Sequence, residues 1–247
     1  MSKSARDRAS AKRIVEQQKA AARRRRVTIW TSAAVVAVLA IAGLIGWGVL
    51  AGQQHDNAGK LTTPSVAVDE GTAFAVGTGP VVVDLYEDFL CPICHEFETQ
   101  TGPAIKQLIS ANKVTVRYHP VSILDDKSNG TKYSTRSAGA AAAAAIDGKF
   151  TEYHDVLYAN QPAENSDGLS DAKLIELGKS VGLGDTFATA VQEDTYDAWA
   201  AKATDTFAAR GFTGTPTIVV AGKTVEGPNQ TLPTTELFTQ AVTQAAG

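Results

Sequence analysis

Apolar residues form one long uncharged run before the shorter patterned segments begin. Residues 27–50 contain 24 positions without a charge. At about 1.5 Å per residue they would extend roughly 36 Å, enough to cross a hydrocarbon core of about 30 Å. Trp30 and Trp47 lie near the two ends, where aromatic rings favour the membrane interface. We therefore predict one transmembrane helix over residues 27–50.

The rest of the chain is patterned like an α/β domain. Residues 51–65 are polar and unpatterned, which indicates a linker ahead of a domain at 66–247. Alternating or β-branched runs predict strands at 73–76, 81–86, 114–121, 217–220 and 223–226. Helical spacing predicts helices at 92–109, 133–146, 150–160, 170–181, 185–193, 195–209 and 233–246. This order predicts a mixed central sheet flanked by helices, with a helical insertion at about 125–210.

Three residues predict local features of these helices. Pro103, after Gly102, should kink the first helix because proline removes a backbone hydrogen bond. Ser170 should cap a helix at its N-terminus, and Pro233 should lie near the first turn of the last helix. The alanine run at 140–145 indicates close helix packing.

Charge is distributed unevenly and gives the run at 27–50 an orientation. Residues 1–26 hold ten Lys or Arg against Asp7 and Glu16, whereas the part after residue 50 has 13 basic and 24 acidic residues. The arginines at 23–26 precede the apolar run directly, so the positive-inside rule predicts a cytoplasmic arm at 1–26 and an extracytoplasmic domain. A cleaved signal peptide ending near Ala51 is the alternative, although the run is long for one. The arm lacks interleaved aromatic residues, so we expect no nucleic-acid partner.

Cys91 and Cys94, the only cysteines, stand between a predicted strand and a predicted helix. A structural disulfide closing so short a loop contributes only about 2 kcal/mol. A zinc site lacks partners, since no pair among His55, His95, His119 and His154 has metal-ligand spacing; we expect no metal and no cofactor. A redox pair fits better, because the helix dipole would stabilise a Cys91 thiolate while Cys94, one turn later, is shielded and suits the resolving role.

Two segments carry a family resemblance. Residues 81–94, ending in Cys91-Pro92-Ile93-Cys94, resemble the active-site strand and helix start of DsbA-like thioredoxin-fold oxidoreductases. Residues 211–220, with Thr215-Pro216, resemble that family's cis-proline loop and following strand. The resemblance covers about residues 70–246 and implies a thioredoxin fold. It also implies a cis peptide at Pro216 and pairing of the Thr215 backbone with an extended substrate.

The sequence departs from that family near the cysteines. Leu85 stands where many relatives have a buried acid, and Ile93 where a histidine often stabilises the thiolate. The nearby carboxylates disfavour a thiolate by like charge, whereas His95 could partly oppose them; they are Glu87, Asp88, Glu96 and Glu98. We therefore expect a Cys91 pKa above 5 and a milder oxidant than the most oxidising relatives. His154 is interpreted as a packing residue without a partner.

The sequence thus favours a membrane-anchored thiol–disulfide oxidoreductase acting on cysteines of exported proteins, mainly as an oxidase. A quinone-linked membrane thiol oxidase, DsbB-like or vitamin K epoxide reductase-like, is the expected reoxidising partner. Two alternatives stay open. One is a reductase or isomerase with the same site, and the other is a non-catalytic sensor or binding ectodomain.

Overall fold

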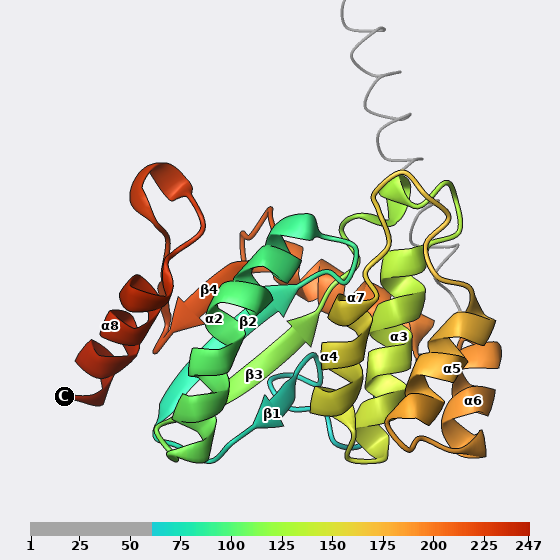
Figure 1. The fold of residues 1–247 in the computed structure, drawn as a ribbon, viewed down its shortest axis with the longest axis horizontal. Coiled ribbons are helices and arrows are strands. Elements are labelled where there is room, and N and C mark those ends of the chain that lie inside the picture. Colours follow the sequence, from blue (N-terminus) through green and yellow to red (C-terminus); the bar gives the residue numbers. More distant parts are fainter. Residues whose placement is uncertain (1–60) are drawn as a thin grey trace, which may run out of the picture. The chain divides into compact units, whose positions relative to one another are not determined.

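Five strands form one mixed sheet in the computed structural model, which describes residues 61–247 (Figure 1). In the order β1-β3-β2-β4-β5, β2 lies in the middle, parallel to β3 and antiparallel to β4. The bounds are β1 Phe74–Val76, β2 Val81–Glu87, β3 Val114–Pro120, β4 Thr217–Val220 and β5 Lys223–Thr224. The five predicted strands are confirmed, although β5 ends two residues before the predicted end.

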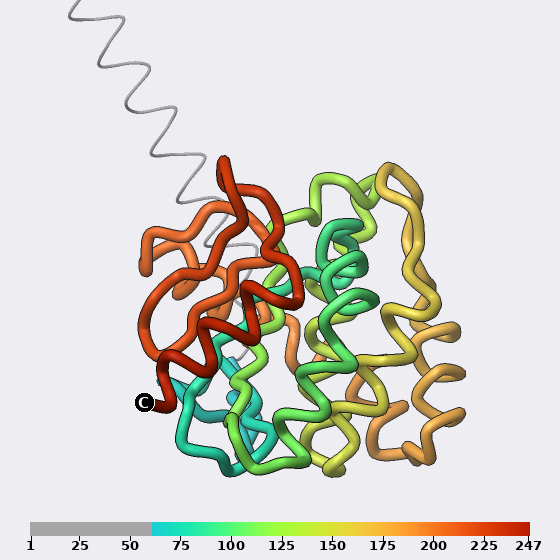
Figure 2. Tube along the Cα trace, turned by 60° about the vertical axis from the view of Figure 1, so that its left-hand side comes forward, coloured from blue at the N-terminus to red at the C-terminus, as the bar shows by residue number. Residues whose placement is uncertain are grey.

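The central strand lies between two layers of helices; one of its faces is apolar through Val81, Val83 and Leu85, whereas the other carries Asp84. Val83 and Leu85 in β2 are fully buried, as expected of a strand between two layers. The helix α2 (Pro92–Ser110) follows β2 and crosses the front of the sheet in Figure 1. The last helix, α8 (Thr235–Ala246), contacts α2, and both views show these two segments side by side (Figure 2).

The predicted helical insertion lies between β3 and β4. Figure 1 shows α3 to α6 gathered beyond one edge of the sheet, and α7 contacts β3. The alanine run of α3 is buried, so small side chains let this helix pack closely against α4, α6 and α7. The helices are α3 Tyr133–Ile146, α4 Phe150–Ala159, α5 Asp171–Ser180, α6 Asp185–Gln192 and α7 Asp197–Ala209, with short 3₁₀ turns η1 Asp125–Lys127 and η2 Pro228–Gln230.

The helix ends test the capping predictions. The Ser170 side chain accepts a hydrogen bond from the Lys173 N–H, so the predicted N-cap of α5 is confirmed. Pro233 lies near the first turn of α8, but the helix begins at Thr235, two residues after the predicted start, and the Thr234 side chain caps it by accepting from the Leu237 N–H. The Thr234 hydroxyl can accept a hydrogen bond from a free N–H of the first turn, whereas the proline side chain has no acceptor. Pro103 lies inside α2, which continues through it as one helix.

The described part of the chain begins within the predicted linker. The arm at 1–26, the transmembrane helix at 27–50 and residues 51–60 lie outside it. Pro64 is buried, so the packed region begins slightly before the predicted start at residue 66. Within residues 61–247, no helix has both the length and the apolar character needed to span a membrane.

Candidate active site

The two cysteines lie where β2 leads into α2. Cys91 is the N-cap residue of α2 in an extended conformation, and Pro92 occupies the first turn, as predicted. Both thiols are free; Cys91 is 6% exposed and Cys94 is completely buried. Cys91 is therefore the thiol that a partner reaches more easily.

The loop before β4 places the other predicted site residues beside Cys91. The Thr215–Pro216 peptide is cis, as the resemblance implied, and the Cys91 thiol donates a hydrogen bond to the Thr215 carbonyl at 3.3 Å. A groove of about 560 Å³ adjoins this contact, lined by Ile93, Phe212, Thr215, Pro216 and Leu232 among others. Four predicted residues, the two cysteines with Thr215 and Pro216, thus lie at one site.

The electrostatic setting separates the two thiols. The pKa of Cys91 is lowered to about 6, mainly by a hydrogen bond from the Cys94 thiol. Burial acts in the opposite direction and raises this pKa. The N–H groups of Ile93 and Cys94 at the helix start lower it further. Burial, followed by the contact with Cys91, raises the pKa of Cys94 well above its ordinary value. Cys91 is the group poised to form a thiolate, with a pKa in the range above 5 expected from the sequence.

Asp88, predicted as a modulator of the thiolate, is a buried anchor of the redox loop. Its carboxylate accepts hydrogen bonds from the Leu90 N–H at 2.8 Å, the Leu124 N–H at 3.0 Å and the Ser134 hydroxyl at 2.7 Å. Burial raises the pKa of Asp88 to about 7 despite these donors. The side chain therefore ties the loop before Cys91 to the helical insertion.

Glu87 and Glu98 converge with His154 in a group that we call the His154 cluster. The His154 Nε2 lies 3.0 Å from Glu87 Oε2, and both side chains are buried. The interpretation of His154 as a packing residue is confirmed by its burial, but the expectation that it has no partner was wrong. Burial, followed by the charge of Glu87, raises the pKa of Glu98 to about 8. Burial disfavours the charged imidazole, yet Asp155 and Glu87 raise the pKa of His154 to about 10.

The acidic residues predicted to surround the thiols as one group are dispersed. Glu96 is exposed and accepts from Gln100, whereas Asp88, Glu87 and Glu98 are held at the positions described above. Alternation along β2 and the turn of α2 separate neighbours in sequence onto different faces. His95 is half-buried, with its ring 6.1 Å from that of Tyr158.

The helical insertion also holds the backbone of the redox loop, which sequence reasoning missed. Gln161 Nε2 donates to the Phe89 carbonyl at 3.1 Å and to the Cys91 carbonyl at 2.9 Å. The Tyr158 hydroxyl donates to the Asp88 carbonyl at 3.4 Å. No spacing in the sequence links residues about 70 positions apart, so only the fold reveals these contacts.

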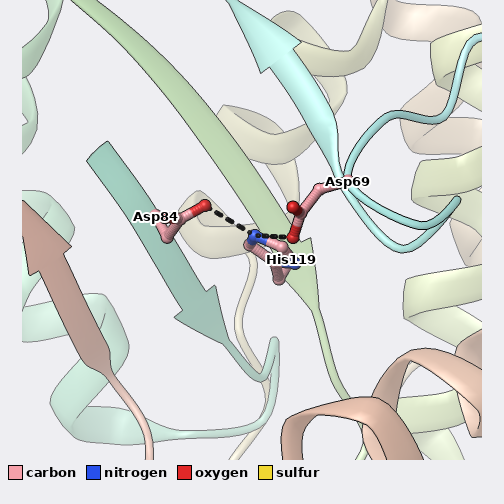
Figure 3. A group of neighbouring side chains, drawn as sticks. All are labelled: Asp69, Asp84 and His119. Atoms are coloured by element: carbon pink, nitrogen blue, oxygen red, sulfur yellow. Dashed lines mark hydrogen bonds and ion pairs between the residues drawn. The ribbon is translucent and has the colours of Figure 1, made fainter. Parts of the chain in front are cut away.

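A second group of a histidine and two carboxylates, the His119 cluster, lies on the other face of β2. Asp69, Asp84 and His119 converge so that the ring nitrogen faces both carboxylates (Figure 3), at 3.1 Å from Asp84 and 3.8 Å from Asp69. Arg117 pairs with both carboxylates, and Arg210 pairs with Asp69 at 2.7 Å. Burial disfavours the charged form of Asp84, but hydrogen bonds from His119 and Arg117 outweigh it and lower the pKa of this carboxyl group. This cluster is a closed ion-pair network.

The fold and the site agree with comparisons to known proteins. The family model described as Thioredoxin matches residues 58–237. The reduced disulfide bond oxidoreductase DsbG of Mycobacterium tuberculosis is 31% identical with a TM-score of 0.63, over 72% of this chain and 89% of that one. Oxidised DsbA of the same organism is 30% identical with a TM-score of 0.62, over 71% of this chain and 93% of that one.

Curated relatives match over a smaller part of their own length. The serine/threonine-protein kinase PknE of Mycobacterium tuberculosis is 28% identical over 60% of this chain and 28% of its own length. The Na(+)/H(+) antiporter NhaA 3 of Salinispora tropica is 32% identical over 60% of this chain and 21% of its own length. The chain therefore spans about a quarter of these two relatives.

A redox pair at a helix start, packed beside a cis-proline loop on a mixed sheet, defines the thiol–disulfide oxidoreductases of the thioredoxin fold. The chain belongs to the thioredoxin family, as an enzyme of the DsbA-like group of thiol–disulfide oxidoreductases.

Proposed function

We propose that the protein introduces disulfides into exported proteins. The observation that carries the proposal is the contact between Cys91 and the Thr215 carbonyl at the edge of the groove. An extended substrate pairing with the Thr215 backbone would bring its own sulfur to Cys91. Main-chain pairing of this kind accepts many sequences.

The exchange runs through Cys91 in both steps. A substrate thiolate attacks Cys91 Sγ of the enzyme disulfide, and Cys94 leaves as a thiolate and takes up a proton. A second substrate thiolate then attacks the substrate sulfur of the mixed disulfide, and Cys91 leaves as a thiolate. The substrate loses two electrons and the enzyme gains them. The lowered pKa of Cys91 makes it the better leaving group.

The direction of the reaction depends on how well the reduced form is stabilised. The pKa of Cys91 is lowered, so its thiolate is stabilised in the reduced protein. A stabilised reduced form makes the enzyme disulfide a stronger oxidant. The test is the equilibrium reduction potential of the protein against glutathione. We expect a value more oxidising than about −200 mV, and a value below about −250 mV would instead support a reductase.

The division of labour between the cysteines is tested separately. Cys94→Ala should accumulate mixed disulfides with exported proteins, because Cys91 still reacts but the resolving thiol is missing. Cys91→Ala is the matched control and should trap none. The reverse pattern would exchange the two roles.

We also propose that the enzyme is anchored by residues 27–50, with its domain outside the cytoplasm. The uncharged run and the arginines at 23–26 support this orientation. A quinone-linked membrane thiol oxidase would return Cys91 and Cys94 to the disulfide. Protease added to intact cells should digest the domain and spare an N-terminal tag, whereas a secreted product beginning near Gly52 would refute the anchor.

The sensor or binding ectodomain is a second candidate, favoured by the similarity to part of a protein named as a kinase. The cysteines discriminate between the two. If the double variant Cys91→Ala/Cys94→Ala keeps the cellular function, the protein acts as a sensor, and if function is lost, redox chemistry is required.

A further inference from the structure

The His154 cluster gathers ligand atoms from three separate elements. Glu87 comes from the end of β2, Glu98 from α2 one turn after Cys94, and His154 from α4. One ligand atom from each lies within 4.8 Å of the others. Because no two of these residues share a metal-ligand spacing in the sequence, only the fold brings them together.

Two oxygens of this cluster have no partner. Glu87 Oε1 and Glu98 Oε1 are buried and accept no hydrogen bond, and the Glu87 side chain is only 4% exposed. A buried acceptor without a donor has lost its hydrogen bonds to water and gained none in return, and the free-energy cost is larger if the group is charged. Two such oxygens at one place indicate that a donor or a cation belongs there.

His154 is oriented as a metal-ligating histidine is. Its Nε2 faces Glu87 at 3.0 Å, while its Nδ1 faces Asp155 Oδ1 at 3.8 Å. Asp155 is itself paired with Lys106 at 2.6 Å. A carboxylate behind the non-ligating nitrogen fixes the ring and increases the basicity of the ligating one.

A route from solvent reaches the cluster. A cavity of about 470 Å³ is lined by Glu98 and His154, together with His95, Asp155 and Tyr158. An ion could therefore enter without unfolding of α2 or α4.

We propose that Glu87, Glu98 and His154 form a binding site for a divalent transition-metal ion such as Zn²⁺ or Mn²⁺. One imidazole with two carboxylates suits these ions, whereas Ca²⁺ and Mg²⁺ prefer oxygen ligands alone. Three protein ligands leave a position for water from the cavity. The ion would lie between His154 Nε2 and Glu87 Oε2, which are 3.0 Å apart, and would also reach Glu98.

The His119 cluster supplies the matched control. It has the same kinds of side chain, but Arg117 and Arg210 already neutralise both carboxylates. A cation there would face two guanidinium groups. We therefore expect the ion to bind at the His154 cluster and not at the His119 cluster.

Isothermal titration of the full-length protein with Zn²⁺ tests the site. The disulfide form is used so that Cys91 and Cys94 cannot bind the ion. We expect one ion per chain. Glu98→Gln should weaken binding at least about tenfold, Asp155→Asn by about tenfold, and His119→Gln should leave it unchanged.

Two results would overturn the proposal. One is the absence of binding at about 1 mM Zn²⁺. The other is binding that Glu98→Gln leaves at full strength, which would place the ion elsewhere. Circular dichroism of Glu98→Gln distinguishes loss of the site from loss of the fold, and Co²⁺ absorption spectra report the coordination number and the absence of thiolate ligands.

Discussion

The His119 and His154 clusters lie on opposite faces of the same strand and contain the same kinds of side chain. Asp84 supplies one and Glu87 the other, three positions apart along β2. In the His119 cluster, both carboxylates are paired with arginines. In the His154 cluster, two carboxylate oxygens remain without a partner. The neighbouring cations, and not the histidine and carboxylates themselves, decide whether such a group stabilises the fold or is available to bind a ligand.

Removing the arginine at the closed cluster should have the largest effect. Arg117→Ala leaves Asp84, whose side chain is 9% exposed, without its main partner. Because the Arg117 side chain is itself 29% exposed, we expect the unfolding free energy to fall by about 3 kcal/mol, which is at the low end for breaking a buried ion pair. Urea denaturation measures it. Lys223→Ala, at an exposed position, controls for loss of one charge. A loss below about 1 kcal/mol for Arg117→Ala would remove the distinction between the clusters.

Acid should weaken the same cluster. The folded-state pKa of Asp84 is lowered, so its contribution to stability is present above the ordinary aspartate pKa and is lost as the pH falls through the folded value. Thermal unfolding between pH 5 and pH 2 should therefore show a smaller fall in stability for Asp84→Asn than for the unchanged protein. Asp126→Asn, with a side chain 71% exposed, is the control. Parallel curves for the protein and Asp84→Asn would contradict this.

A substitution in the redox motif should act independently of both clusters. Ile93 is 47% exposed beside Cys91, and a histidine there would stabilise the thiolate when protonated. We expect Ile93→His to lower the pKa of Cys91 from about 6 and to make the reduction potential more oxidising, by about 30 mV per pKa unit. Thiolate absorbance and glutathione equilibria measure the two quantities. An unchanged pKa would show that the Cys94 thiol and the N–H groups of the helix start already determine the pKa of Cys91.

The smallest effect is expected at the open cluster. Glu98→Gln replaces a carboxyl group whose Oε1 has no partner and whose pKa is raised to about 8 by burial. With a chelator present, we expect the unfolding free energy to change by less than about 1 kcal/mol, because no buried ion pair is broken. A loss of about 3 kcal/mol, as for Arg117→Ala, would mean that Glu98 is a structural residue.

The sequence predicts the fold well because the segments are strongly patterned. The bounds of α3 agree with the predicted 133–146, and Cys91, Cys94, Thr215 and Pro216 lie together as expected. The start of α8 was misplaced because both Pro233 and Thr234 suit a helix N-terminus, and the side-chain cap prevailed. The His154 cluster was missed because its members come from three elements. The sequence did hold one indication that Glu98 faces inward. It follows Cys94 by four residues and therefore lies on the same face of the helix as that buried cysteine.

The hydrogen bonds from the insertion to the redox loop have a consequence for protein engineering. A minimal redox module could be sought by excising residues 125–210 and joining β3 to β4 directly. That deletion would strip the Phe89 and Cys91 carbonyls of the Gln161 amide and Asp88 of the Ser134 hydroxyl. Chimeras that exchange active-site loops between relatives should therefore carry the matching residues of α3 and of the segment directly after α4 with them.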